Sequence, residues 1–124
     1  MAATALIAAA LLAQSAPSLA AEPAQTETVD VGYQELRSGA PAAVIAKIEA
    51  NADLASDPAA LINLGNAYAR LGETAKALQL YRAAAASDTR YDLELADGRW
   101  MDSRLAARRA LGALQNSTRQ ALRN

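Results

Sequence analysis

The sequence contains no cysteine, no histidine and no phenylalanine, and only one tryptophan. Without cysteine and histidine the chain has no disulfide, no thiolate nucleophile, no attached haem and none of the usual zinc ligands. The remaining Ser, Tyr, Lys and carboxylate residues form no recognisable nucleophile–base pair, and no glycine-rich phosphate loop is present. The sequence therefore indicates a protein that is not an enzyme and needs no cofactor or metal.

Alanine supplies much of the hydrophobic content, which is 52% of the 124 residues. Alanine is the best helix former, so the composition favours the all-α class. Each small side chain buries little apolar area, and we expect moderate stability. The length is that of one modest domain.

The first twenty residues have the layout of a secretory signal peptide. The apolar run from Ala2 to Ala13 is too short to span a bilayer as a helix. Ser18 and Ala20 place small residues before a cleavage site, although no Lys or Arg lies near the start. We expect residues 1–20 to be removed and the mature chain to be periplasmic or secreted. The alternative is an alanine-rich N-terminal helix or an uncleaved anchor.

Residues 58–91 predict two antiparallel helices. Apolar residues recur at spacings of three and four in the first helix, at Leu61, Leu64, Tyr68 and Leu71. Asp57 and Pro58 are typical of a helix start, and Gly72 of a helix end. Because the connection is short, the second helix, with Ala77, Leu78, Tyr81 and Ala84 on its buried side, must turn back on the first.

Gly65 lies inside the first of these helices, where glycine costs about 1 kcal/mol relative to alanine. Close packing of two helices needs small residues where their axes approach. We expect Gly65 to mark the point at which the second helix, carrying Ala77, comes close. Tyr68 and Tyr81 would fill the spaces beside it.

This pattern resembles the tetratricopeptide repeat, a helix-turn-helix unit of 34 residues. Leu64, Gly65 and Tyr68 match the first-helix pattern of the family, with Leu61 in place of its Trp, and Ala77, Tyr81 and Ala84 match the second helix. Thr89 stands where the closing Pro of the repeat is expected. The resemblance implies a short array of α-α repeats of this type, with 58–91 as its best repeat.

A single repeat cannot bury its own hydrophobic surface, so the flanking residues must contribute. Residues 29–57 predict a degenerate repeat, with a short helix over 29–37 that points Tyr33 and Leu36 inward. A second helix follows over 41–51, and the helical domain spans 29–124. Residues 21–28 are expected to form a flexible N-terminus.

Residues 92–124 predict a small β-hairpin and a capping helix. Large hydrophobic residues alternate with acidic residues and alanine up to Asp97 and Gly98, a favoured type I′ turn pair. We expect Trp100, which follows this turn, to dock on the helices. The alternative is the first helix of another degenerate repeat. Asp102 can start a last helix over 103–122 whose inner face holds Leu105, Ala107, Ala110, Leu111 and Leu114. The carboxylates of the hairpin lack the spacing of a calcium loop, so no metal site is expected.

Charge is divided along the chain. Residues 1–98 hold twelve acidic and six basic residues, whereas residues 99–124 hold six arginines and Asp102 alone. The simplest interpretation is a solvated helix face studded with arginine, and the alternative is an anionic partner or surface. The basic end lacks the interleaved aromatic residues typical of nucleic-acid binding.

In tetratricopeptide arrays the first helices line a concave face that grips peptides or partner helices. By resemblance, the partner-binding residues here are Ala59, Ile62, Asn66, Ala69 and Arg70. Asn66 and Arg70 lie one helical turn apart, so an amide and a guanidinium can act together on a peptide. The alternative is an ordinary polar helix surface. The resemblance gives Asn63 a structural role, bonding to neighbouring backbone.

The sequence thus predicts a non-catalytic module that binds a peptide or protein partner. Substitution of Asn66 and Arg70 by alanine is expected to weaken partner capture without changing thermal unfolding. The alternatives are a self-associating assembly protein, or an arginine-rich C-terminal helix that binds an anionic surface. No nucleic acid and no stable membrane insertion are expected.

Overall fold

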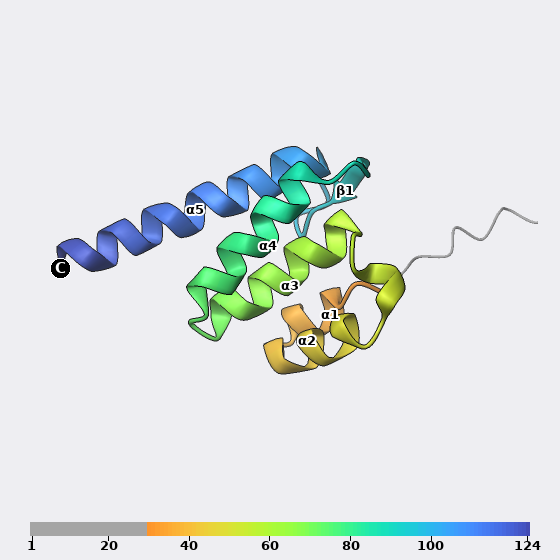
Figure 1. Ribbon diagram of the computed structural model, residues 1–124, viewed down its shortest axis with the longest axis horizontal. Helices are drawn as coiled ribbons and strands as arrows, with labels where there is room; N and C mark the ends of the chain where they lie inside the picture. Colours follow the sequence, from red (N-terminus) through yellow and green to blue (C-terminus); the bar gives the residue numbers. More distant parts are fainter. Residues whose placement is uncertain (1–29) are drawn as a thin grey trace, which may run out of the picture.

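The computed structural model describes residues 30–124, so the expected signal peptide and the N-terminus at 21–28 lie outside the described residues. Within them the chain is mainly helical and has one two-stranded antiparallel sheet (Figure 1). The elements in chain order are α1 (Tyr33–Arg37), α2 (Pro41–Glu49), the 3₁₀ helix η1 (Ala52–Leu54), α3 (Pro58–Arg70), α4 (Thr74–Ala86), β1 (Asp92–Glu94), β2 (Trp100–Asp102) and α5 (Ser103–Arg123).

The helices α3 and α4 form an antiparallel pair, with both expected ends of α3 in place. The side chain of Asp57 accepts a hydrogen bond from the amide of Ala60 at 2.8 Å, which caps the N-terminus. At the other end, the amide of Glu73 donates to the carbonyl of Tyr68 at 2.9 Å. Gly72, at φ 76°, lets the chain reverse there into α4.

The close approach predicted at Gly65 is real, but its partner is Tyr81 and not Ala77. A Cβ atom on Gly65 would lie 2.6 Å from Cε1 and 2.8 Å from Cδ1 of the Tyr81 ring. These distances are well inside van der Waals contact, so only glycine leaves room for the ring. Ala77 is fully buried in the same core.

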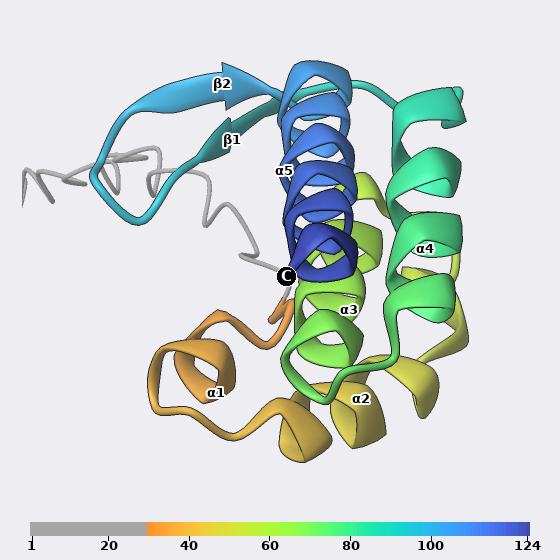
Figure 2. The ribbon, with the colours of Figure 1, turned by 90° about the vertical axis from the view of Figure 1, so that its left-hand side faces the viewer.

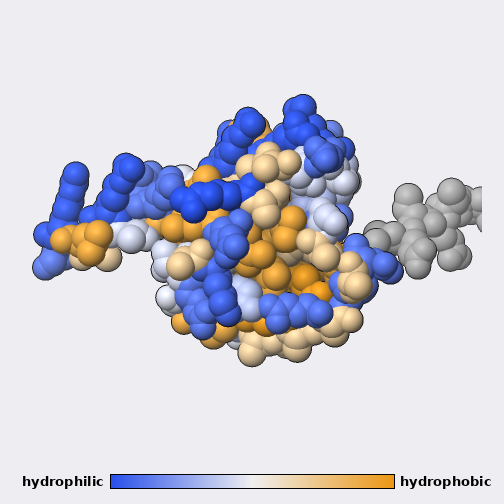
Figure 3. All heavy atoms as spheres, in the orientation of Figure 1, coloured by the Kyte–Doolittle hydropathy of each residue, from blue (hydrophilic) through white to orange (hydrophobic). Residues whose placement is uncertain are grey.

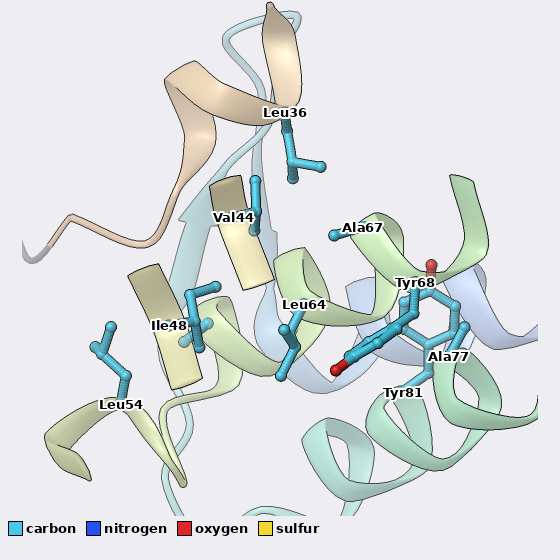
Figure 4. Close-up of a cluster of buried hydrophobic side chains, with 10 residues drawn as sticks. Leu36, Val44, Ile48, Leu54, Leu64, Ala67, Tyr68, Ala77 and Tyr81 are labelled. Carbon is cyan, nitrogen blue, oxygen red and sulfur yellow. The ribbon is translucent and has the colours of Figure 1, made fainter. Parts of the chain in front are cut away.

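The main core lies between α1, α2, η1, α3 and α4 (Figure 4). Its buried side chains are Leu36, Val44, Ile48, Leu54, Ala60, Leu64, Ala67, Tyr68, Ala77 and Tyr81. Leu36 points inward as predicted, but the prediction for Tyr33 is wrong because Tyr33 is 40% exposed. The helix was predicted over residues 29–37, but α1 begins only at Tyr33.

The last helix, α5, lies along α4 and also contacts α3, and its C-terminal half extends beyond the other helices (Figure 1). Asp102 caps it by accepting the amide of Leu105 at 3.0 Å, as the sequence predicts. The predicted inner face is wrong at Leu105, whose side chain is exposed. Ala107 is buried, and Ala110, Leu111 and Leu114 pack against the core.

The two strands confirm the predicted hairpin and exclude a helix at residues 92–94. Their connection differs from the expected two-residue turn. The amide of Leu95 donates to the carbonyl of Arg99 at 2.7 Å, and that of Gly98 to the carbonyl of Leu95 at 2.9 Å. A type I′ turn needs positive φ at both central residues, but in residues 30–124 only glycines have positive φ. The loop therefore has three residues, 96–98, with Gly98 at φ 80°.

This extra loop residue shifts the register of the hairpin and reverses the orientation of Trp100. A two-residue turn would place Trp100 opposite Leu95, on the apolar face of β1. In the observed register Trp100 lies opposite Glu94, and Met101 opposite Leu93. A one-residue shift moves every side chain of a strand to the other face. The prediction that Trp100 docks on the helices is therefore wrong, and its side chain is 67% exposed.

Hydrophobic side chains are also exposed near the middle of the face shown in Figure 3, between hydrophilic borders. A small hollow of about 260 Å³ lies between α2, η1, α3 and α4. Its apolar lining residues are Ile48, Ala52, Leu54, Ala55, Leu61, Leu64 and Leu80. Leu80 is half-buried there, so the core formed by α3 and α4 is not completely covered on this side.

Candidate functional site

A groove of about 1060 Å³ lies between α1, α3, the hairpin and the start of α5. Figure 2 shows α1 and the hairpin on one side of α3, and α4 on the other. Its lining residues are Val31, Tyr33, Leu36, Arg37, Asp57, Ala59, Ile62, Asn63, Asn66, Arg70, Tyr91, Asp92, Leu93, Glu94, Leu95, Ala96, Trp100 and Ala106. The volume slightly exceeds the range of small-molecule pockets, about 300–1,000 Å³.

Four of the five residues proposed from the sequence line this groove: Ala59, Ile62, Asn66 and Arg70. The fifth, Ala69, is not among the lining residues. Its methyl group is half-buried and packs against the main core. The other four residues therefore share the face of α3 that lines the groove, whereas Ala69 belongs to the core side.

The polar groups of Asn66 and Arg70 also hold the fold together. The hydroxyl of Tyr81 donates to Oδ1 of Asn66 at 2.6 Å. A guanidinium N–H of Arg70 donates to the backbone carbonyl of Leu36, which ties the end of α3 to α1. Arginine has five N–H donors, so Arg70, which is exposed, retains donors for a ligand.

Asn63 has the backbone-bonding role that the resemblance implied. Its side-chain amide donates to the carbonyl of Val31 at 2.9 Å. This bond holds the chain just before α1 against the middle of α3, and so shapes one wall of the groove.

Three aromatic residues of the groove were missed as site residues by the sequence reasoning. Tyr33, Tyr91 and Trp100 all line it and are 40%, 38% and 67% exposed. Their position depends on the start of α1 and on the register of the hairpin. The available signal was the single tryptophan in a short hairpin, a segment too small to bury it.

Tyr91 joins the hairpin to the start of α3. Its hydroxyl donates to Oδ1 of Asp57 at 2.6 Å, while the other carboxylate oxygen of Asp57 caps α3. Partial burial raises the pKa of Tyr91 to about 12, and the hydrogen bond to the Asp57 carboxylate adds to this effect. The carboxylate of Asp57 is therefore committed to the fold at both oxygens.

Charge is separated along the groove. Arg37 and Arg70 lie near the carbonyl of Leu36, at the C-terminal end of α3. Asp57 lies at the N-terminal end, and a helix of 13 residues is about 20 Å long at a rise of about 1.5 Å per residue. A ligand that follows α3 would meet basic groups at one end and acidic groups at the other.

The hairpin contributes two carboxylates, Asp92 and Glu94, to the groove. Among residues 30–124, no ion pair includes either of them. The arginines of this region are paired elsewhere: Arg90 contacts Asp102 at 2.5 Å, and Arg99 contacts Asp97 at 2.7 Å. Neither strand carboxylate therefore has a direct ion-pair partner in this part of the chain, although the positive charge of Arg90 is close enough to interact with Asp92.

Within the described part of the chain, no group of three or more acidic residues is placed to hold a metal ion. Comparisons of the whole chain with family models, with curated proteins and with solved structures gave no match. The resemblance to the tetratricopeptide repeat therefore rests on the residues quoted above and stays a prediction.

Proposed function

We propose that the chain is a non-catalytic binding module that takes an extended segment of another protein into the groove. The observation that carries the proposal is the placement of the partly exposed rings of Tyr33, Tyr91 and Trp100 around one concave surface. Tyr and Trp are enriched among the residues that dominate the energy of protein interfaces. The apolar side chains of Ile62 and Leu93 line the same groove and would be covered by the same segment.

The proposal includes a tetratricopeptide-like arrangement. The helices α1, α3 and α5 alternate with α2 and α4 along the chain. Each of α1, α3 and α5 supplies at least one residue to the groove, whereas α2 and α4 supply none. In that arrangement α1 and α2 form the degenerate repeat, α3 and α4 the best repeat, and α5 a cap. The hairpin, which has no counterpart in the repeat, forms one wall of the groove.

We place the module outside the cytoplasm because of the signal-peptide pattern at residues 1–20, and infer an adaptor or assembly role in the periplasm. Over residues 30–124 no helix is both long enough and apolar enough to cross a bilayer.

A capture experiment tests the proposed function. The purified protein is immobilised and exposed to periplasmic extract, and the bound partners are quantified for the wild type and three variants. Trp100→Ala and Ile62→Arg, which alter the groove, should each reduce capture of the same partner. Arg82→Ala changes an exposed residue of α4 outside the groove and should leave capture unchanged. The proposal fails if both groove variants, folded by circular dichroism, capture every partner as well as the wild type.

Self-association is a second candidate because the C-terminal half of α5 extends past its neighbours and exposes Leu122 (Figure 1). Light scattering at micromolar concentration tests it, and a monomer would exclude it. The exposed arginines of α5, Arg108, Arg109, Arg119 and Arg123, keep the anionic-surface alternative open. Binding of that kind should fall steeply as salt rises.

A further inference from the structure

The outer edge of β1 offers main-chain hydrogen-bonding groups to a ligand. The amide of Leu95 donates to the carbonyl of Arg99, and that of Ser103 to the carbonyl of Tyr91. These bonds join directly opposite residues in the register that pairs Leu93 with Met101. Bonded and non-bonded pairs alternate along an antiparallel ladder, so the N–H and C=O of Asp92 and Glu94 point away from β2.

This edge faces the groove. Every residue from Asp92 to Ala96 lines the groove, whereas Trp100 is the one contributor from β2. Figure 2 shows β1 on the side of the hairpin nearer to α1, with β2 beyond it. An extended chain lying in the groove would therefore run beside the unpaired edge.

The hairpin itself is incomplete as a sheet. It has two strands of three residues each, and a two-stranded hairpin is marginally stable in water. A third strand would supply partners to Asp92 and Glu94 and would cover part of the exposed Trp100 ring. Its addition would thus stabilise the protein and the ligand together.

The side chains at this edge select the chemistry of the added strand. Asp92 and Glu94 are negatively charged and lie outside all ion pairs of residues 30–124, while Leu93 is apolar and half-buried. Opposite charges on neighbouring strands are favourable and like charges are unfavourable. A strand with Lys or Arg beside the two carboxylates and an apolar residue between them matches this pattern.

We infer that the partner segment binds by adding a third strand to β1, and that this segment alternates basic and apolar residues. The inference deepens the proposed function and rests on it. It names the ligand class as an extended basic–apolar peptide held by main-chain hydrogen bonds to Asp92 and Glu94.

The test uses a capped octapeptide of alternating lysine and valine, added to the full chain and followed by Trp fluorescence and amide hydrogen exchange. Controls are the same peptide with glutamate for lysine, and a peptide of four lysines followed by four valines. The alternating lysine peptide should bind at least about fivefold more tightly than either control, and should slow exchange at the amides of Asp92 and Glu94.

A pair of variants at one position separates the main chain from the charge. Glu94→Ala removes the carboxylate, whereas Glu94→Pro also removes the outward N–H without breaking a bond to β2. Glu94→Pro should bind the peptide about five- to tenfold more weakly than Glu94→Ala. A contact between Leu93 and Met101 in nuclear Overhauser spectra shows that the hairpin is intact. If this contact is lost in Glu94→Pro, strand addition is judged only from the amide exchange rates of Asp92 and Glu94 in the wild type.

Each outcome separates strand addition from the wider proposal. Equal binding by the two variants, with unchanged exchange at Asp92 and Glu94, overturns strand addition. Failure of the alternating peptide to bind also overturns it. If capture still depends on Trp100 in either case, the groove function stands without strand addition. If capture no longer depends on the groove, both proposals fail.

Discussion

The ring of Tyr81 lies over Gly65 and is fixed at its far end by Asn66. The Cε1 atom of Tyr81 is 2.6 Å from the position that a Cβ on Gly65 would occupy, and the Tyr81 hydroxyl donates to Asn66 at the same distance. Adjacent residues of α3 thus leave space for one aromatic side chain of α4 and anchor it. This contact joins the core of the helix pair to the floor of the groove, because Asn66 also lines the groove.

Gly65→Ala should destabilise the protein by about 1–3 kcal/mol, because the new methyl group forces the buried Tyr81 ring out of its place. The matched control is Gly112→Ala in α5, where nothing lies within 4 Å of the added carbon. That change should stabilise the protein by about 0.5–1 kcal/mol through helix propensity. Urea unfolding measures both, and a Gly65→Ala variant at least as stable as the wild type would contradict the packing described here.

Asn66→Ala and Tyr81→Phe should each cost about 1 kcal/mol, because they remove the same hydrogen bond of 2.6 Å. The double variant should lose little more than either single one, giving a coupling energy of about 1 kcal/mol in a double-mutant cycle. If the losses of stability in the two single variants add up in the double variant, the hydrogen bond contributes nothing to stability. This contact also replaces the expectation that alanine at Asn66 and Arg70 leaves unfolding unchanged, since both side chains hold the fold.

Tyr91→Phe should reduce the loss of stability at alkaline pH. The folded-state pKa of Tyr91 is raised from 10.0 to about 12, so between these values the unfolded chain loses its proton first and becomes favoured. The stabilisation is complete below pH 10 and is lost as pH rises toward 12. Tyr68, whose bond to Glu49 also raises its pKa to about 12, is the second contributor. Urea unfolding measured across this range should show that the free energy of unfolding falls less steeply with pH in Tyr91→Phe than in the wild type. An unchanged pH dependence would contradict the assignment.

Lys47→Met should lower stability at neutral pH and remove part of its dependence on acid pH. Lys47 pairs with Asp30 and Glu35, and hydrogen bonds from Lys47 lower the pKa of both carboxyl groups in the folded state. The stabilisation is present above the ordinary pKa values of 3.8 and 4.5 and is lost as pH falls through the lower folded values.

The stabilities of Lys47→Met and the wild type should therefore converge as the pH falls through the lowered folded-state pKa values of these carboxyl groups, where they become protonated. Lys76→Met is the control, because its pair with Glu73 is more than half-exposed at 3.5 Å and should contribute little at any pH. A constant difference between Lys47→Met and the wild type across the acid range would mean that the ion pairs do not cause the pH dependence.

The sequence predicted the helices well where local chemistry determines them. The N-terminal caps of Asp57 and Asp102 and the glycine end of α3 follow from side chains that bond within their own turn. These features depend on residues only a few positions apart in the chain. The face of α3 that lines the groove was assigned from the resemblance to the tetratricopeptide repeat.

The misplaced residues depend on contacts that local patterns do not specify. A loop of three residues in place of two turned Trp100 from the core to the groove. Asn66 and Arg70 lie on the face that lines the groove, but their bonds to Tyr81 and Leu36 come from other elements. Tyr33 was assigned inward although α1 has one buried residue, Leu36. Helix spacing gives a direction for a side chain and not the partner it meets.

A photocrosslinking residue at position 100 tests the central claim, that the groove takes up a segment of a partner protein. The wild-type residue is replaced by p-benzoylphenylalanine at Trp100, and at Arg82 on α4 in the control, and both proteins are irradiated in periplasmic extract. If the groove binds a partner segment, an adduct should form at position 100 that excess wild-type protein suppresses, with none at position 82. An adduct confined to position 82, or none at either position, would contradict it.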